Sequence, residues 1–108
     1  MKKTILIGAL SVFCVAKGAA QIPDAVNTVL KKNACNSCHK LDKKGLAPSW
    51  EDIATKHYDK KTIIALIKEP KPSNWPGFTP MAALPNVPKA DLGKIADWIV
   101  SLHKEDGK

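Results

Sequence analysis

Apolar residues recur every three or four positions near both ends of residues 24–104, and this spacing predicts helices with one buried face. The first expected helix begins at Asp24, which we take as its N-cap, and runs into Cys35. The last expected helix spans residues 89–104. Its buried stripe consists of Leu92, Ile95, Ile99 and Leu102, widened by Ala96 and Trp98.

Two shorter helices are expected between these, each opened by a polar cap. Ser49 followed by Asp52 forms a variant capping box, and we expect this helix to end near His57. Asp59 caps the next helix, which Pro70 prevents from continuing. The pattern therefore predicts an all-α domain of three to five helices.

A long loop should separate the last two helices, because residues 69–88 contain six of the eight prolines. Proline lacks a backbone donor and fixes φ, so this segment is expected to run as a stiff, irregular loop over the surface. It also contains apolar side chains that disordered segments generally lack. These anchors are Trp75, Phe78, Met81 and Leu84.

The N-terminal segment has the pattern of an export signal, with two early lysines, an uncharged run over residues 4–16 and small residues up to Ala20. The run of 13 residues is shorter than the roughly 20 apolar residues that span a bilayer. We therefore expect residues 1–20 to be removed as a signal peptide. Residues 21–108 then form one domain in the periplasm, without a membrane-spanning segment.

Once the signal is removed, two cysteines remain, and they stand with a histidine in the pattern C-x-x-C-H at Cys35, Cys38 and His39. In this pattern two thiols add across the vinyl groups of a haem and the adjacent imidazole ligates the iron. The spacing lets one helical turn present both sulfurs. A domain of 88 residues often needs such a group to be stable. One motif predicts one covalently bound haem c.

Three other interpretations of the cysteine pair lack a companion feature. A thioredoxin-like redox site would lie at a helix start within a βαβ pattern, which the chain does not show. A zinc site needs four clustered ligands, and His57 and His103 are far from any second Cys/His pair in the sequence. A structural disulfide would leave His39 unexplained. Covalent haem is therefore the interpretation that we favour.

The axial ligands of the iron follow from position in the chain. His39 is the expected proximal ligand, and the carbonyl of Pro48 is the favoured acceptor for its other ring nitrogen. Met81, His57 and His103 are the candidates for the distal ligand. A lone methionine among prolines is usually a packing residue, but its soft thioether binds haem iron well and Met81 lies in the long loop. We therefore favour Met81.

The chain resembles the short bacterial class I cytochromes c in four features. These are the haem motif after a first helix, Pro48 beyond it, the run Trp-Pro-Gly-Phe-Thr-Pro-Met at residues 75–81, and the last helix with Trp98. The resemblance covers nearly all of residues 21–108. It implies the cytochrome c fold, with helices wrapped around one covalently attached haem. It also implies that Pro48 accepts a hydrogen bond from the proximal imidazole and that Trp75 approaches a haem propionate.

The chain departs from this family's pattern at three positions. Ala47 stands where the family often has glycine before the proline, and Leu30 stands where an aromatic residue is common. Ala82 follows Met81, where family members often have proline. The turn before Pro48 and the path of the loop after Met81 are therefore expected to differ from those of the family.

An iron with histidine and methionine on its two axial positions has no open site for a substrate, so it can only change oxidation state. We therefore expect a one-electron carrier between redox proteins, not an enzyme. One alternative is a haem subunit bound permanently in a periplasmic oxidoreductase, which would need an extensive apolar interface. A peroxidase or ligand-sensing haem protein is a further alternative, and its iron would have to open a coordination site.

The formal net charge is +7, and the excess beyond the signal lies near the haem motif. Residues 21–68 contain nine lysines and five acidic residues, whereas residues 69–108 contain five of each. Such a field would steer the protein towards acidic patches on its redox partners. Nucleic acid is a poor partner because the chain has no arginine, and we expect a monomer. The lysines that flank the motif are Lys31, Lys32, Lys40, Lys43 and Lys44.

Overall fold

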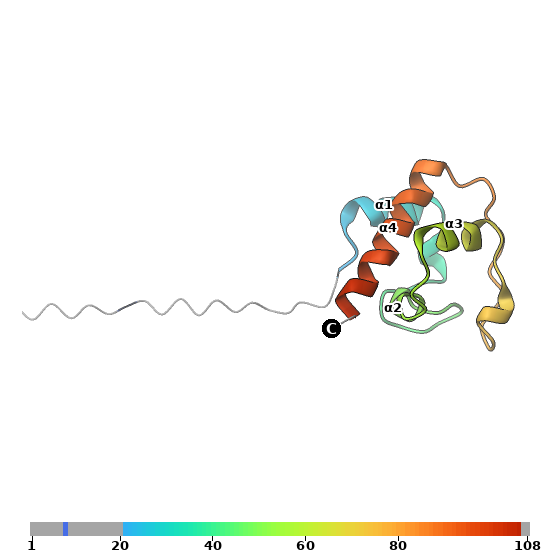
Figure 1. The fold of residues 1–108 in the computed structure, drawn as a ribbon, viewed down its shortest axis with the longest axis horizontal. Helices are drawn as coiled ribbons and strands as arrows, with labels where there is room; N and C mark the ends of the chain where they lie inside the picture. The colour runs from blue at the N-terminus through green and yellow to red at the C-terminus, as the bar shows by residue number, and fades with distance from the viewer. Residues whose placement is uncertain (1–7, 9–20, 107–108) are drawn as a thin grey trace, which may run out of the picture.

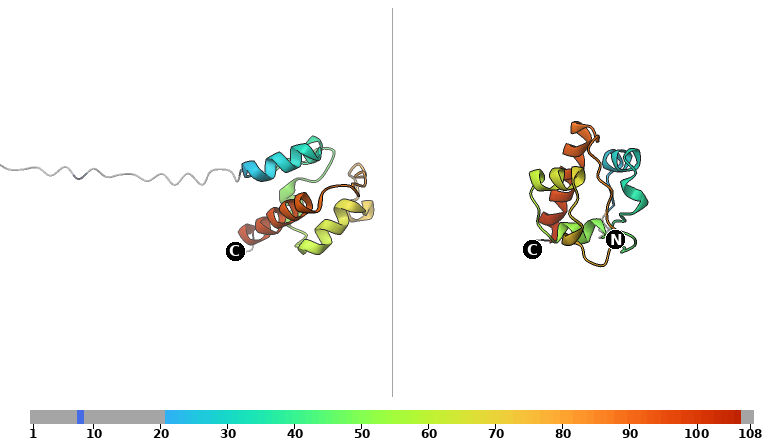
Figure 2. Two further views of the ribbon diagram at one scale, coloured as in Figure 1. Left: turned by 90° about the horizontal axis from the view of Figure 1, so that it is seen from above. Right: turned by 90° about the vertical axis from the view of Figure 1, so that its right-hand side faces the viewer.

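The last helix, α4 (Lys89–Asp106), is the element against which the other three helices pack. These are α1 (Asp24–Lys32), α2 (Trp50–Ala54) and α3 (Lys60–Lys68), as Figure 1 shows. Two further views place α4 between α1 and α3 (Figure 2). The computed structural model describes Gly8 and residues 21–106 and contains no strand among them, which confirms the all-α prediction.

The segment expected to be an export signal, residues 1–20, lies outside the described residues apart from Gly8. Within the part of the chain that the structure describes, no helix is long and apolar enough to cross a membrane.

The core lies where one face of α4 meets the other helices. The stripe predicted for the last helix is buried over its whole length, and Ala96 and Trp98 are buried beside it. Leu30 from α1, Ala54 from α2 and Ile63 from α3 belong to the same cluster, and Leu30 is fully buried. Burial of this apolar surface is the main force that assembles four helices of modest length.

The caps predicted for α2 and α3 are confirmed. The Oγ of Ser49 accepts a hydrogen bond from the backbone of Asp52 at 3.0 Å, and Asp52 accepts one from the Ser49 backbone at 3.3 Å. Asp59 accepts from the backbone N–H of Thr62 at 2.7 Å. The helical part of α2 ends at Ala54, and a turn continues to His57, whose φ of 52° ends the helical path.

Both predicted ends of α1 were wrong. The N-cap is Pro23, whose carbonyl accepts from the backbone of Asn27 at 2.8 Å, and Asp24 lies inside the first turn, where a negative charge favours the helix. The helix ends at Lys32, three residues before Cys35. It stops there because the next residues leave the helical path, and Ala34 has a φ of 61°.

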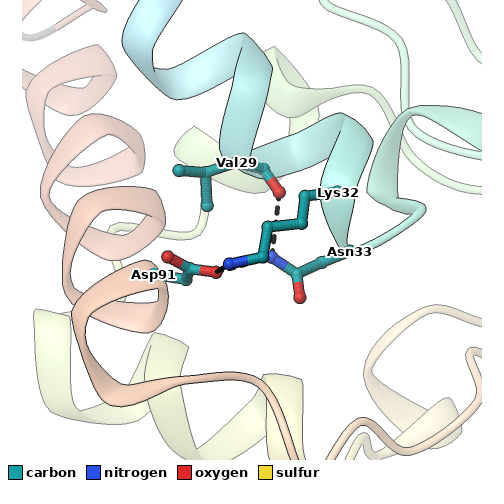
Figure 3. Close-up of polar contacts among 4 residues, drawn as sticks. All are labelled: Val29, Lys32, Asn33 and Asp91. Atoms are coloured by element: carbon teal, nitrogen blue, oxygen red, sulfur yellow. Dashed lines mark hydrogen bonds and ion pairs between the residues drawn. The ribbon is translucent and has the colours of Figure 1, made fainter.

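A polar cluster joins the end of α1 to the start of α4 (Figure 3). The side-chain amide of Asn33 donates to the carbonyl of Val29 at 2.9 Å and to Asp91 Oδ2 at 3.2 Å. Lys32 Nζ lies 3.3 Å from the same Asp91 oxygen. The hydrogen bond from Asn33 and the ion pair with Lys32 hold the pKa of Asp91 below its ordinary value. The cluster fixes the chain just before Cys35 relative to α4.

Residues 69–88 form the ordered, irregular loop that the prolines predict, with one 3₁₀ turn, η2 (Pro72–Asn74). Backbone hydrogen bonds tie the loop to the body of the protein at two points. Thr79 donates to the carbonyl of Leu46 at 3.2 Å, and Leu84 donates to that of Ile67 at 3.1 Å. Two residues before the first of these points, Gly77 has a φ of 89°, a conformation that favours glycine.

Candidate haem-binding site

A cavity of 440 Å³ opens between the haem motif and the proline-rich loop. Its lining is mainly apolar and comes from α2, α3, α4 and the connecting segments. The size and composition suit a sizeable apolar group. All six residues expected at the haem site line this one cavity: Cys35, Cys38, His39, Pro48, Trp75 and Met81.

The two cysteines flank one short turn. Cys35 begins η1 (Cys35–Ser37), and Cys38 is the residue directly after it. The carbonyl of Cys35 accepts from the backbone of Cys38 at 3.3 Å and from that of His39 at 3.1 Å. Cys35 is half-buried, which raises the pKa of its thiol, whereas Cys38 is exposed. One turn therefore carries both sulfurs and the imidazole along the same wall, as the C-x-x-C-H spacing predicts.

His39 is buried, and its ring is held by a hydrogen bond from Nδ1–H to the carbonyl of Pro48 at 2.8 Å. Since Nδ1 is engaged in this bond, Nε2 is the nitrogen left to bind a metal. Burial lowers the pKa of His39, although the hydrogen bond to Pro48 opposes this effect. The neutral imidazole, which is the form that ligates iron, is therefore favoured at neutral pH.

Trp50 forms a wall beside His39 that was not expected as part of the site. Its ring centroid lies 4.5 Å from that of His39, with the planes 31° apart. Trp98 contacts Trp50 edge-on at 5.5 Å, so the indole is packed between the histidine and α4. In the sequence, Trp50 is the first apolar residue of the short helix that Ser49 opens. Its position directly after the cap Ser49, two residues beyond Pro48, was the available signal.

Of the three candidates for the distal ligand, the structure brings Met81 to the cavity. Met81 is 38% exposed, so its side chain lies at the rim. His57 and His103 are absent from the cavity lining. Their rings contact each other instead, with centroids 5.0 Å apart, although 46 positions separate them in the sequence.

The residues present fit a c-type haem better than a zinc ion. No group of three or more His, Cys, Asp or Glu side chains within the described part of the chain could hold a metal ion. A haem brings four nitrogen ligands of its own and needs only axial ones from the protein. Cys35 and Cys38 would attach it, and His39 and Met81 would ligate its iron. The apolar walls from α3 and α4 would cover the ring.

Comparison with known proteins agrees with this geometry. A family model described as Cytochrome c matches residues 23–103. Cytochrome c-552 of Nitrosomonas europaea is 38% identical over 76 residues, which cover 67% of this chain and 73% of that protein. Cytochrome c-552 of Hydrogenobacter thermophilus is 30% identical over 106 residues, which cover 94% of this chain and 99% of that protein.

A solved structure supports the same assignment of the fold. The N64Del mutant of Nitrosomonas europaea cytochrome c552 superposes with a TM-score of 0.62 and 35% sequence identity. The match covers 70% of this chain and 98% of that one. The helices of this chain and their connections therefore follow an arrangement already seen in a solved protein.

Proposed function

Because this chain belongs to the cytochrome c family and carries a covalently attached haem c, we propose that it is an exported one-electron shuttle with His39 and Met81 as axial ligands. The chain is an electron carrier and not an enzyme, as its relatives are. The proposal adds the ligands, the compartment and the manner in which partners are recognised.

The observation that carries the proposal is that Met81 and His39, which is buried and whose pKa is lowered by that burial, line the same cavity. When bound, the haem supplies an iron that can gain or lose one electron. Pro48 holds the His39 ring in one tautomer through the bond to Nδ1–H. With the haem bound, the apolar lining would exclude water from the iron, and together with a thioether ligand it would favour the reduced form and raise the potential.

Exposed groups near the cavity mouth support recognition of acidic partners. Leu46 lines the cavity and is 63% exposed, which is unusual for a large apolar side chain. Lys43 and Lys44 precede it and are exposed, as is Lys40. An apolar contact next to a group of cations suits transient docking on an acidic surface, where electrostatic attraction speeds the encounter.

Replacement of the proposed distal ligand tests the core of the proposal. Met81→Ala is expected to abolish the sulfur-to-iron charge-transfer band of the oxidised protein, to lower the reduction potential and to permit binding of imidazole or cyanide. Leu84→Ala is the matched control, because Leu84 lies in the same loop and also lines the cavity. If Met81→Ala and Leu84→Ala change the spectrum and the potential equally, Met81 is only a packing residue.

Export is tested separately, by N-terminal sequencing of the protein recovered from the periplasmic fraction. The proposal predicts that the mature chain begins at Gln21. A chain that still carries residues 1–20 would contradict a cleaved signal while leaving the axial ligands untouched.

A further inference from the structure

The hydrogen bond from His39 Nδ1–H to the carbonyl of Pro48 holds the imidazole at one atom. The torsion that turns a histidine ring about its Cβ–Cγ bond has a broad energy well. A hydrogen bond also tolerates some misalignment before it weakens steeply. The bond to Pro48 therefore limits the movement of the ring without fixing its plane, and a second contact is needed for that.

The indole of Trp50 makes this second contact. Its ring lies 4.5 Å from that of His39 at an angle of 31° between the planes, a tilted arrangement within the range of favourable aromatic pairs. Trp50 is only 3% exposed, and the edge-on contact with Trp98 supports it from another side. Its Nε1 is buried without a hydrogen-bond partner among the described residues. The indole therefore contacts His39 through its ring and not through its polar atom.

Backbone hydrogen bonds hold the two rings at this distance. The N–H of Trp50 donates to the carbonyl of Lys40 at 2.8 Å, and the N–H of Glu51 donates to that of Leu41 at 3.0 Å. Lys40 directly follows His39 in the chain. The start of α2 is thus tied to the two residues after the histidine, so the indole and the imidazole cannot separate unless these bonds open.

We propose that Trp50 is a positioning residue that holds the proximal imidazole in one plane and keeps water from its bond to Pro48. The inference rests on the ligation of the iron by His39 proposed above and adds what fixes the orientation of that ligand. His39, Pro48 and Trp50 are all buried, which leaves little room for water at the bond. An imidazole that keeps one plane in both oxidation states reduces the reorganisation that accompanies each electron transfer.

The test is NMR of the mature holoprotein in both oxidation states. In the oxidised protein, the shifts of the haem methyl groups report the plane of the axial imidazole. In the reduced protein, deuterium exchange of the His39 Nδ1 proton reports how often the bond to Pro48 opens. Trp50→Leu is expected to alter the methyl shifts and to speed this exchange about tenfold, because an aromatic pair is lost. Trp50→Phe keeps a flat ring beside His39 and should stay close to the wild type in both measurements.

Leu92→Ala is the matched control for a general loss of stability, because Leu92 is 2% exposed in the core and is absent from the cavity lining. Exchange of the Nδ1 proton is compared in each variant with that of its own slowest α4 amides, which corrects for global unfolding. If Trp50→Leu then differs from the wild type no more than Leu92→Ala does, or if Trp50→Phe behaves as Trp50→Leu, the positioning role is refuted.

The wild-type protein provides a test that does not depend on whether a variant folds. Its Nδ1 proton should exchange about as slowly as the slowest amides of α4, since the bond to Pro48 should open only when the packed rings separate. Exchange far faster than that of the α4 amides would contradict the proposal. Absence of the sulfur-to-iron band in the wild type would instead refute Met81 as the distal ligand, and the exchange measurement would still decide the role of Trp50.

Discussion

Single residues in the connecting segments adopt backbone conformations that the site requires. Gly77 has a φ of 89° in the loop between Trp75 and Met81, and a Cβ added there would meet nothing within 4 Å. The cost of a side chain at this position is therefore one of backbone conformation and not of space. A side chain at position 77 would strain the loop, and the strained loop would hold Met81 less firmly. The conformation of Gly77 therefore affects the position of the proposed distal ligand.

Gly77→Ala is expected to destabilise the folded holoprotein by about 1–2 kcal/mol, because an L-residue is strained at this φ. Gly45→Ala is the control, since its Cβ also meets nothing within 4 Å and its φ lies outside the left-handed region. That substitution should change stability by less than about 1 kcal/mol. Guanidinium unfolding followed by circular dichroism measures both. Equal costs for the two substitutions would show that the Gly77 conformation is not strained.

The motif residues could be placed from the sequence because the C-x-x-C-H spacing acts within a single turn. Their geometry depends on local backbone hydrogen bonds, such as that from His39 to the carbonyl of Cys35 at 3.1 Å. The contact of Trp50 with His39 could not be placed in this way. It depends on how the loop between the two residues folds back, and the spacing of apolar residues does not predict the path of a loop.

Among the elements, α1 and α4 are joined by polar groups as well as by their buried faces. Asp91 is 8% exposed and accepts from Asn33 while it pairs with Lys32. Its folded pKa is lowered, so the ionised form stabilises the fold. This contribution is present above the ordinary pKa of an aspartate and is lost as the pH falls through the lowered folded pKa.

Asp91→Asn is therefore expected to lower the midpoint of thermal unfolding at pH 7 and to flatten its dependence on pH below about 4. The difference from the wild-type protein should shrink as the pH falls, because Asp91 then becomes neutral in both states of the wild type. Asp97→Asn is the control, since the Asp97 ion pair with Lys60 at 2.9 Å is exposed and should matter less. A difference between wild type and Asp91→Asn that stays constant down to pH 2 would contradict a role for the carboxylate charge.

The caps and buried faces of the helices could be predicted because they depend on residues three or four positions apart. The end of α1 could not, because Asn33 and Ala34 carry no helix-breaking signal as strong as proline. There the helix ends at a long-range contact, between the Asn33 amide and Asp91 of α4. The pairing of His57 with His103 was missed for the same reason, since it joins the end of α2 to α4.

For the whole molecule, charge is distributed unevenly and the excess lies in the half that carries the haem motif. An anionic probe should therefore react with the protein faster at low salt than at high salt. The double substitution of Lys43 and Lys44 by glutamine should slow oxidation of the reduced protein by hexacyanoferrate(III) severalfold at low ionic strength. Stopped-flow rates should converge with those of the wild type at about 1 M salt, where charges are screened within about 3 Å.

Replacing Lys89 and Lys94 by glutamine makes the matched control, because both lysines are exposed on α4 in the half without excess charge. Rates that fall equally in both double variants would show that only net charge matters. The lysines next to the haem motif would then have no particular part in steering.

The central claim is that one haem is attached at Cys35 and Cys38 and that His39 and Met81 occupy both axial positions of its iron. The most direct measurement is the absorption spectrum of the oxidised wild-type protein, matured in a host that attaches haem c. We predict a low-spin spectrum with the sulfur-to-iron charge-transfer band. A high-spin spectrum without that band would contradict the claim, because the iron would then have an open side.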